Sequence, residues 1–146
     1  PYTPYTNNVE YVTMSTLGNS ANFGELPEFK GHGAPICSAT RGIYAGGAGG
    51  PNANSASGQN TIHVITITTL GDAVDFGDTC IQSGGSPSGA SSCTRGLVMG
   101  GIFSGSYVNT ISYISIESMG DAVDFGDMVQ VGGSREGASN GHGGLG

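Results

Sequence analysis

Basic residues are scarce in this sequence. Lys and Arg together number four against eleven Asp and Glu, which gives a formal net charge of −7. Binding to a phosphate backbone needs a clustered basic surface, so we expect no nucleic-acid partner. No apolar run approaches the ~18 residues of a membrane span, so we expect no membrane insertion. The sequence begins at Pro1 without Met. We expect a processed, trimmed or partly observed chain, so the absence of a signal peptide carries little weight.

Cysteine is also scarce, and Trp is absent. The three cysteines are odd in number and lack the Cys-x-x-Cys spacing of structural zinc sites. We expect Cys37, Cys80 and Cys93 to be small buried residues of sheet packing. The sequence leaves open whether Cys80 and Cys93 pair.

Sets of residues for catalysis are missing as well. His32 and His142 each stand in a Gly-His-Gly loop, and His63 lies on an expected strand, with no nearby acid or Cys to complete a site. No Gly-x-Ser-x-Gly motif stands between a strand and a helix, and no Tyr, Cys and His set suggests copper chemistry. We expect the protein not to be an enzyme.

Glycine, at 28 residues, and internal repetition are what the sequence has in abundance. The octad GDAVDFGD occurs at residues 71–78 and unchanged at 120–127, and a degenerate copy, GNSANFGE, occurs at 18–25. The copies start about 50 residues apart, a spacing typical of one supersecondary unit per repeat. We predict a single repeat domain over 1–146, with units at approximately 1–17, 18–70, 71–119 and 120–146, the first and last being partial.

Each unit has the pattern of four short strands. Residues 7–14, 60–67 and 109–116 share an alternation of β-branched and polar residues that predicts a strand with one buried face; we call it the anchor strand. The octad follows, and its single Phe is expected to plug the core between sheets; these residues are Phe23, Phe76 and Phe125. We predict that each unit has, in chain order, a Gly/Ser/Ala-rich strand, a Thr-Arg-Gly strand that ends in a Gly pair, the anchor strand and a final strand that carries the Phe. The sequence therefore predicts an all-β fold.

A hydrophobic strand that ends in Gly46-Gly47 or Gly100-Gly101, followed by a loop and a strand that opens with Asn-Thr, resembles the kelch-like repeats of galactose-oxidase-type β-propellers. Phe stands in the octad where that family usually has Trp. The Phe-Gly-Asp and Thr-Arg-Gly motifs resemble those of kelch-like repeat proteins encoded by marine tailed phages, especially cyanophages. The resemblance implies four-stranded propeller blades and a virion or extracellular location, and it carries over no catalytic residues.

The position of the repeats relative to a four-stranded blade indicates how the protein assembles. About three units are present, out of register with the blade, whereas propellers have roughly four to eight blades. Either the ring is completed by missing chain, or subunits complete one another's blades. A two-chain ring is the simplest closed form and a filament is the open one. The expected partners are therefore further copies of the chain or other structural subunits.

Two sets of charged residues could carry function. The octad acids could supply oxygen ligands to calcium or could cap turns through their own backbone; they are Asp72, Asp75, Asp78, Asp121, Asp124 and Asp127. Arg41 and Arg95 could grip an acidic sugar or could pair with the octad acids and tie neighbouring blades, and we favour the second interpretation. No cofactor is expected apart from that calcium.

The leading hypothesis is a non-enzymatic structural protein, an appendage or fibre component of a virion. The alternative is a lectin-like propeller that binds cell-surface glycan. Sugars are bound by aromatic faces and amide hydrogen bonds, which Tyr and Asn side chains can supply. Its candidate residues are Tyr44, Asn52, Asn54, Tyr107 and Asn109.

Overall fold

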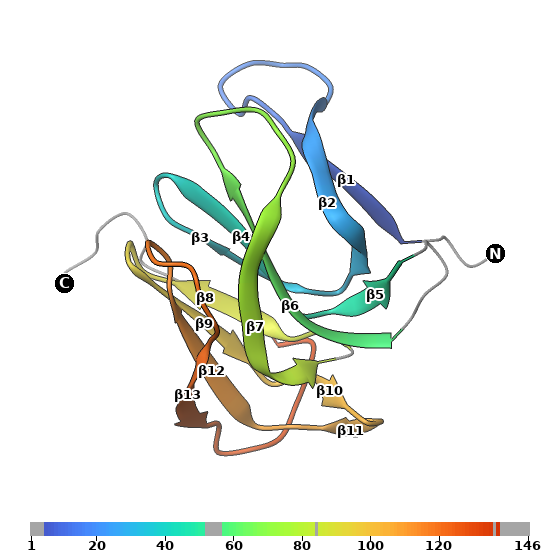
Figure 1. The fold of residues 1–146 in the computed structure, drawn as a ribbon, viewed down its shortest axis with the longest axis vertical. Coiled ribbons are helices and arrows are strands. Elements are labelled where there is room, and N and C mark those ends of the chain that lie inside the picture. Colours follow the sequence, from blue (N-terminus) through green and yellow to red (C-terminus); the bar gives the residue numbers. More distant parts are fainter. Residues whose placement is uncertain (1–4, 52–56, 84, 136, 138–146) are drawn as a thin grey trace.

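The computed structural model describes residues 5–51, 57–83, 85–135 and 137, and these residues form thirteen strands and no helix (Figure 1). The fold is all-β, as predicted. The strands are β1 (Thr6–Tyr11), β2 (Ala21–Gly31), β3 (Ala34–Cys37), β4 (Arg41–Ala45), β5 (Ala48–Gly50), β6 (Ser57–Thr66), β7 (Val74–Ser83), β8 (Ser88–Ser91), β9 (Arg95–Met99), β10 (Ile102–Phe103), β11 (Ser106–Tyr107), β12 (Thr110–Ser115) and β13 (Val123–Asp127).

The same four-stranded antiparallel meander occurs twice. In the first, β3, β4, β6 and β7 pair in chain order, and in the second β8, β9, β12 and β13 do so. Each begins with the short Gly/Ser/Ala-rich strand, continues with the Thr-Arg-Gly strand and the anchor strand, and finishes with the octad Phe. The predicted order of strands within a unit is confirmed. The pair β1 and β2 repeats the last two strands only.

The first two groups of strands join into one curled sheet. Its order is β1-β2-β5-β6-β4-β3, with β7 also paired to β6, and the short strand β5 connects β2 to the start of β6. Figure 1 shows this sheet curled like half a barrel, with the second meander beside it. Within each meander the pairing runs from the first to the fourth strand. The octad that opens each predicted unit therefore supplies the last strand of a meander, β7 or β13, or the second strand of the β1–β2 pair.

The repeats share unusual backbone conformations as well as pairing. The Gly pair after β4 and the pair after β9 both have left-handed φ values, 63° and 91° against 64° and 104°. In each of the three Gly-rich stretches that follow β2, β7 and β13, a residue that directly follows a Gly is left-handed although it is not Gly. These residues are His32, Ser86 and Ser134, with φ of 59°, 46° and 53°. The sequence repeat is thus a repeat of backbone geometry.

The core lies where the two meanders face each other. It consists of small and branched side chains with one aromatic ring, and its members are Ala34, Ile36, Ile43, Ala45, Ile62, Val64, Phe76, Val98, Ile114 and Ile116. All three cysteines are exposed, contrary to expectation. The reason for Cys37 is that side chains alternate along β3, so Ala34 and Ile36 point into the core and Pro35 and Cys37 point out. The described residues include no helix long and apolar enough to span a membrane.

Candidate interaction site: the junction between octads

The octads lie where successive groups of strands meet. Each octad begins in the turn after an anchor strand and runs into the last strand of its group, β2, β7 or β13. Within the sheets, β7 pairs only with β6 and β13 only with β12, so both strands have an open edge among the described residues. An open edge leaves main-chain donors and acceptors available for another segment.

At the first junction the start of one octad docks on the end of the octad before it. The main-chain amide of Gly71 donates to the carbonyl oxygen of Phe23 at 3.0 Å. Two residues later, the amide of Ala73 donates to the carbonyl oxygen of Glu25 at 2.8 Å. These two bonds join repeats that lie far apart in sequence.

The second junction has the same bonds at the same octad positions. The amide of Gly120 donates to the carbonyl oxygen of Phe76 at 2.8 Å, and the amide of Ala122 donates to that of Asp78 at 2.7 Å. Because both junctions use main-chain groups at fixed octad positions, the octad sequence acts as a repeated docking unit.

A carboxylate completes each junction. Asp72 Oδ1 accepts a hydrogen bond from the amide of Glu25 at 2.9 Å, and Asp121 Oδ1 accepts one from the amide of Asp78 at 3.0 Å. Hydrogen bonds to an ionised acceptor are stronger than neutral ones. The second residue of the octad therefore caps the preceding repeat and not its own turn, which sequence reasoning did not foresee.

Close main-chain approach explains the seventh residue of the octad. A Cβ on Gly24 would overlap the carbonyl oxygen of Gly71, and a Cβ on Gly77 would lie 2.5 Å from the carbonyl carbon and oxygen of Gly120. A side chain at either position would push the two octads apart. At Gly126, the third member of the set, nothing lies within 4 Å of the added Cβ.

Burial of the octad Phe depends on the next repeat. Phe23 and Phe76 are 8% and 3% exposed, whereas Phe125 is 56% exposed. The expected core plug is therefore found at the first two positions and not at Phe125. The physical reason is that an octad start covers each of the first two rings, as Ala122 does when it packs against the cluster that contains Phe76. Among the described residues no octad start docks on Phe125.

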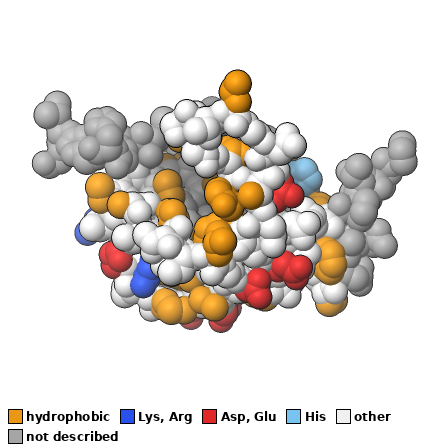
Figure 2. Space-filling view, turned by 90° about the horizontal axis from the view of Figure 1, so that it is seen from above, with side chains coloured by type: hydrophobic (Ala, Val, Ile, Leu, Met, Phe, Trp, Pro, Cys, Tyr) orange, Lys and Arg blue, Asp and Glu red, His pale blue; other side chains and the backbone are white. Residues whose placement is uncertain are grey.

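Apolar side chains are also exposed in the loops that lead from anchor strand to octad. Figure 2 looks onto the end of the molecule where the loops after β1 and β6 project, and hydrophobic side chains stand out on this face. In the loop after β1, Met14 and Leu17 are 97% and 105% exposed. By contrast Ile116, the counterpart of Met14 in the last repeat, is fully buried.

The geometry around the octad acids favours capping. Besides the two junction carboxylates, Asp124 Oδ1 accepts a hydrogen bond from the amide of Gly126 at 3.0 Å, a cap on its own turn of the kind expected. No group of three or more His, Cys, Asp or Glu side chains is placed to hold a metal ion in the part of the chain that the structure describes. Calcium binding by the six Asp residues stays a prediction without a geometric site.

The two Thr-Arg-Gly arginines have different contacts. Arg41 Nη1 donates to the carbonyl oxygen of Ile116 at 2.7 Å and so joins one meander to the next. Arg95 lies over the ring of Tyr113, 5.7 Å from its centroid, within one meander. Arg41 ties neighbouring repeats as expected, but its partner is a main-chain carbonyl and not an octad carboxylate.

The three candidate glycan-binding residues that the structure describes are Tyr44, Tyr107 and Asn109, and Tyr44 lies apart from the other two. Tyr44 lies in the curled sheet, where its Oη accepts a hydrogen bond from the amide of Gly33 at 2.8 Å. Tyr107, on β11, is 55% exposed, and Asn109 Nδ2 donates to the carbonyl oxygen of Met128 at 3.4 Å. Both belong to the other meander. Asn52 and Asn54 lie outside the described residues.

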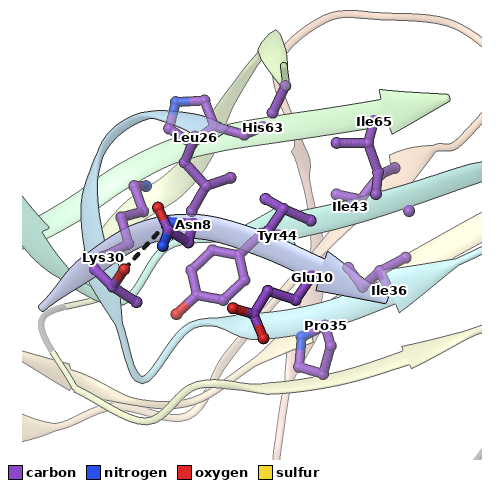
Figure 3. Close-up of a pocket in the computed structure, with 14 residues that line it drawn as sticks. Asn8, Glu10, Leu26, Lys30, Pro35, Ile36, Ile43, Tyr44, His63 and Ile65 are labelled. Atoms are coloured by element: carbon purple, nitrogen blue, oxygen red, sulfur yellow. Dashed lines mark hydrogen bonds between the residues drawn. The ribbon is translucent and has the colours of Figure 1, made fainter. Parts of the chain in front are cut away.

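Tyr44 lines a cavity of about 430 Å³ between the β1–β2 hairpin and strands β3, β4 and β6 (Figure 3). Burial raises the pKa of Tyr44, and the Gly33 amide opposes that shift. The lining is mostly apolar and includes Ile36, Ile43 and Ile65. Its polar side chains include Glu10, Lys30 and His63.

Sequence reasoning missed a buried polar cluster beside this cavity. Lys30, 4% exposed, donates to the carbonyl and hydroxyl oxygens of Thr61, and its Nζ lies 3.4 Å from Glu28 Oε1. Burial lowers the pKa of Lys30, and Glu28 partly offsets the shift. His63 is buried next to it with its Nδ1 unpaired, and burial followed by the Lys30 charge lowers its pKa. A His on the buried face of an anchor strand was the only signal in the sequence.

No protein-family model matches the sequence, and no curated protein matches it significantly.

Proposed function

We propose that the chain is a non-enzymatic structural protein whose repeats are kelch-like β-propeller blades, and that it works in an assembled particle such as a virion appendage or fibre. The observation that carries the proposal is the octad junction. The same three hydrogen bonds join two pairs of repeats, while a third octad end has the same groups and no partner among the described residues. The octad end is a docking surface at two places within the chain, and its third copy has no partner among the described residues. This arrangement suits a protein that forms assemblies.

The contacts between meanders support blades. At the inner strands, a Cβ on Gly89 would overlap the carbonyl oxygen of Pro35, and one on Gly137 would overlap that of Gly89. The first strands β3 and β8 thus approach closely, while the octads link successive last strands. Repeated four-stranded antiparallel sheets that contact their neighbours suit the blades of a propeller.

The polar groups of the described residues support a structural role. Lys30 is the most deeply buried cation, and Thr61, Glu28 and the carbonyl oxygen of Gly46 surround its ammonium group. A buried charge that is paired and hydrogen-bonded stabilises a particular packing. Such a cluster holds strands β2 and β6 together, which suits a structural role.

The assembled mass in solution tests the proposal. Light scattering after size exclusion, followed by negative-stain electron microscopy, should show discrete particles heavier than one chain, with a fraction that grows with concentration. A monomeric mass at every concentration would contradict the assembly role.

Glycan binding is a second candidate because of one observation. The β10–β11 hairpin exposes Phe103 and Tyr107, 43% and 55% exposed, and Phe103 borders a hollow of about 400 Å³. The polar side chains of that hollow are uncharged, Ser57, Gln82 and Ser104, as suits neutral sugars. A glycan array should show binding that is lost on Phe103→Ala and Tyr107→Ala. An array with no binding to neutral or charged sugars would contradict this candidate.

A further inference from the structure

The middle octad, residues 71–78, has two docking ends. The amides of Gly71 and Ala73 donate to the octad before it, and the carbonyl oxygens of Phe76 and Asp78 accept from the octad after it. We propose that residues 18–20 of a second copy of this chain dock on residues 125–127 of the first, so that copies join head to tail. This inference rests on the proposed assembly function and names the partner and the surfaces.

The hydrogen-bonding groups match position by position. By analogy with both internal junctions, the amide of Gly18 in the second copy donates to the carbonyl oxygen of Phe125, and the amide of Ser20 donates to that of Asp127. Asn19 Oδ1 takes the place of Asp72 and Asp121 and accepts from the amide of Asp127. Replacing Asp by Asn keeps the acceptor and removes a charge, which favours contact between two chains that each carry a net charge of −7.

The apolar surfaces are complementary in the same way. Phe125 is 56% exposed, but its counterparts are 8% or less exposed once an octad start covers them. On the other side, Met14 is 97% exposed and its counterpart Ile67 is 44% exposed, whereas Ile116, the counterpart that follows a complete meander, is fully buried. One docking event would cover both surfaces.

Arg95 provides a further match. Arg41 donates to the carbonyl oxygen of Ile116 in the following repeat. At the equivalent position, Arg95 of the first copy donates to the carbonyl oxygen of Met14 in the second copy. The open space at Gly126, where nothing lies within 4 Å of an added Cβ, is the space that an octad start fills at Gly24 and Gly77.

Site-directed cross-linking tests the contact directly. Cys80 Sγ lies 3.4 Å from the carbonyl oxygen of Ala122 across an internal junction, and the corresponding residues at the open junction are Val129 and Ser20. In a chain with all three cysteines replaced by Ser, Val129→Cys molecules mixed with Ser20→Cys molecules should form a pair of twice the chain mass with a short bis-maleimide. Val129→Cys mixed with Ser106→Cys, which lies on the β11 hairpin, is the control. A yield no higher than that of the control would overturn the proposal.

Dissociation variants separate this inference from the proposed function. Asn19→Ala should raise the dissociation constant measured by sedimentation about fivefold, the effect of one lost hydrogen bond, and Phe125→Ser should raise it further. The matched controls Asn22→Ala and Phe103→Ser alter exposed residues outside the docking segments 18–20 and 125–127 and should change little.

The four variants and the wild-type chain distinguish head-to-tail docking from other modes of assembly. Weakening by both junction variants and by neither control supports head-to-tail docking. Assemblies that all four variants leave unchanged overturn it, show that a different surface is used, and leave the structural role standing. A wild-type chain that stays monomeric overturns both, and the open octad end then awaits a further octad of a longer chain.

Discussion

Asp121 Oδ1 accepts a hydrogen bond from the main-chain amide of Asp78 at 3.0 Å, although the two residues belong to successive octads. The bond satisfies an amide at an open sheet edge and fixes the distance between two repeats. We expect Asp121→Ala to lower the free energy of unfolding by about 1–2 kcal/mol, as measured by urea denaturation. Asp121→Asn keeps the acceptor oxygen, as Asn19 does in the first octad, and should lose less than half as much. Equal losses would mean that charge, and not the hydrogen bond, stabilises the junction.

Gly24 tests the close approach of main chains. A Cβ at this position overlaps the carbonyl oxygen of Gly71, so Gly24→Ala should force the first two octads apart and lower the free energy of unfolding by roughly 1–3 kcal/mol. Gly18→Ala is the matched control, because nothing lies within 4 Å of its added Cβ. Thermal unfolding of both variants in dilute solution should show a large shift for the first and a small one for the second. A small shift for Gly24→Ala would mean that the junction relaxes without cost.

The three octad Phe residues should respond differently to truncation. Phe76 is 3% exposed and belongs to the core, so Phe76→Ala should cost about 3–5 kcal/mol of unfolding free energy. Phe125 is 56% exposed, so Phe125→Ala should lower the free energy of unfolding by roughly 1 kcal/mol or less when the protein is dilute enough to be a monomer. Guanidinium denaturation of the two variants measures the difference. Similar losses would contradict the assignment of the Phe125 ring to an open surface.

The fold could be predicted largely because its units are local. The alternation in residues 60–67 and 109–116 and the Gly pairs at 46–47 and 100–101 define strands and turns within one meander, and those strands pair in chain order. Such pairings need only short-range signals. The alternation along β3 that exposes Cys37 was readable in principle, but a four-residue strand with a Pro gives a weak pattern.

The octad junction could not be predicted, because it joins repeats about 50 residues apart through main-chain atoms. Nothing in GDAVDFGD says that Asp72 caps Glu25 and not its own turn, since both uses favour the same residue type. The Lys30 cluster was missed for a similar reason, because Lys30 and Glu28, which both lie on β2, meet Thr61 of β6 only through the curl of the sheet. The repetition of the octad indicates that it has a role, but only its contacts in the structure show what that role is.

His63 should make stability depend on pH. Burial and the nearby Lys30 lower its pKa below the ordinary value of about 6.5 that it has in the unfolded chain. As the pH falls below about 6.5 the unfolded state therefore binds a proton that the folded state still excludes, so stability is lost on acidification. His63→Ser should remove this contribution, since Ser112 is buried at the same position of the next anchor strand. The measurement is the difference in unfolding temperature between pH 7.5 and pH 5.5. The difference should shrink in His63→Ser and persist in His32→Asn, and an unchanged difference in His63→Ser would show that other groups cause the acid sensitivity.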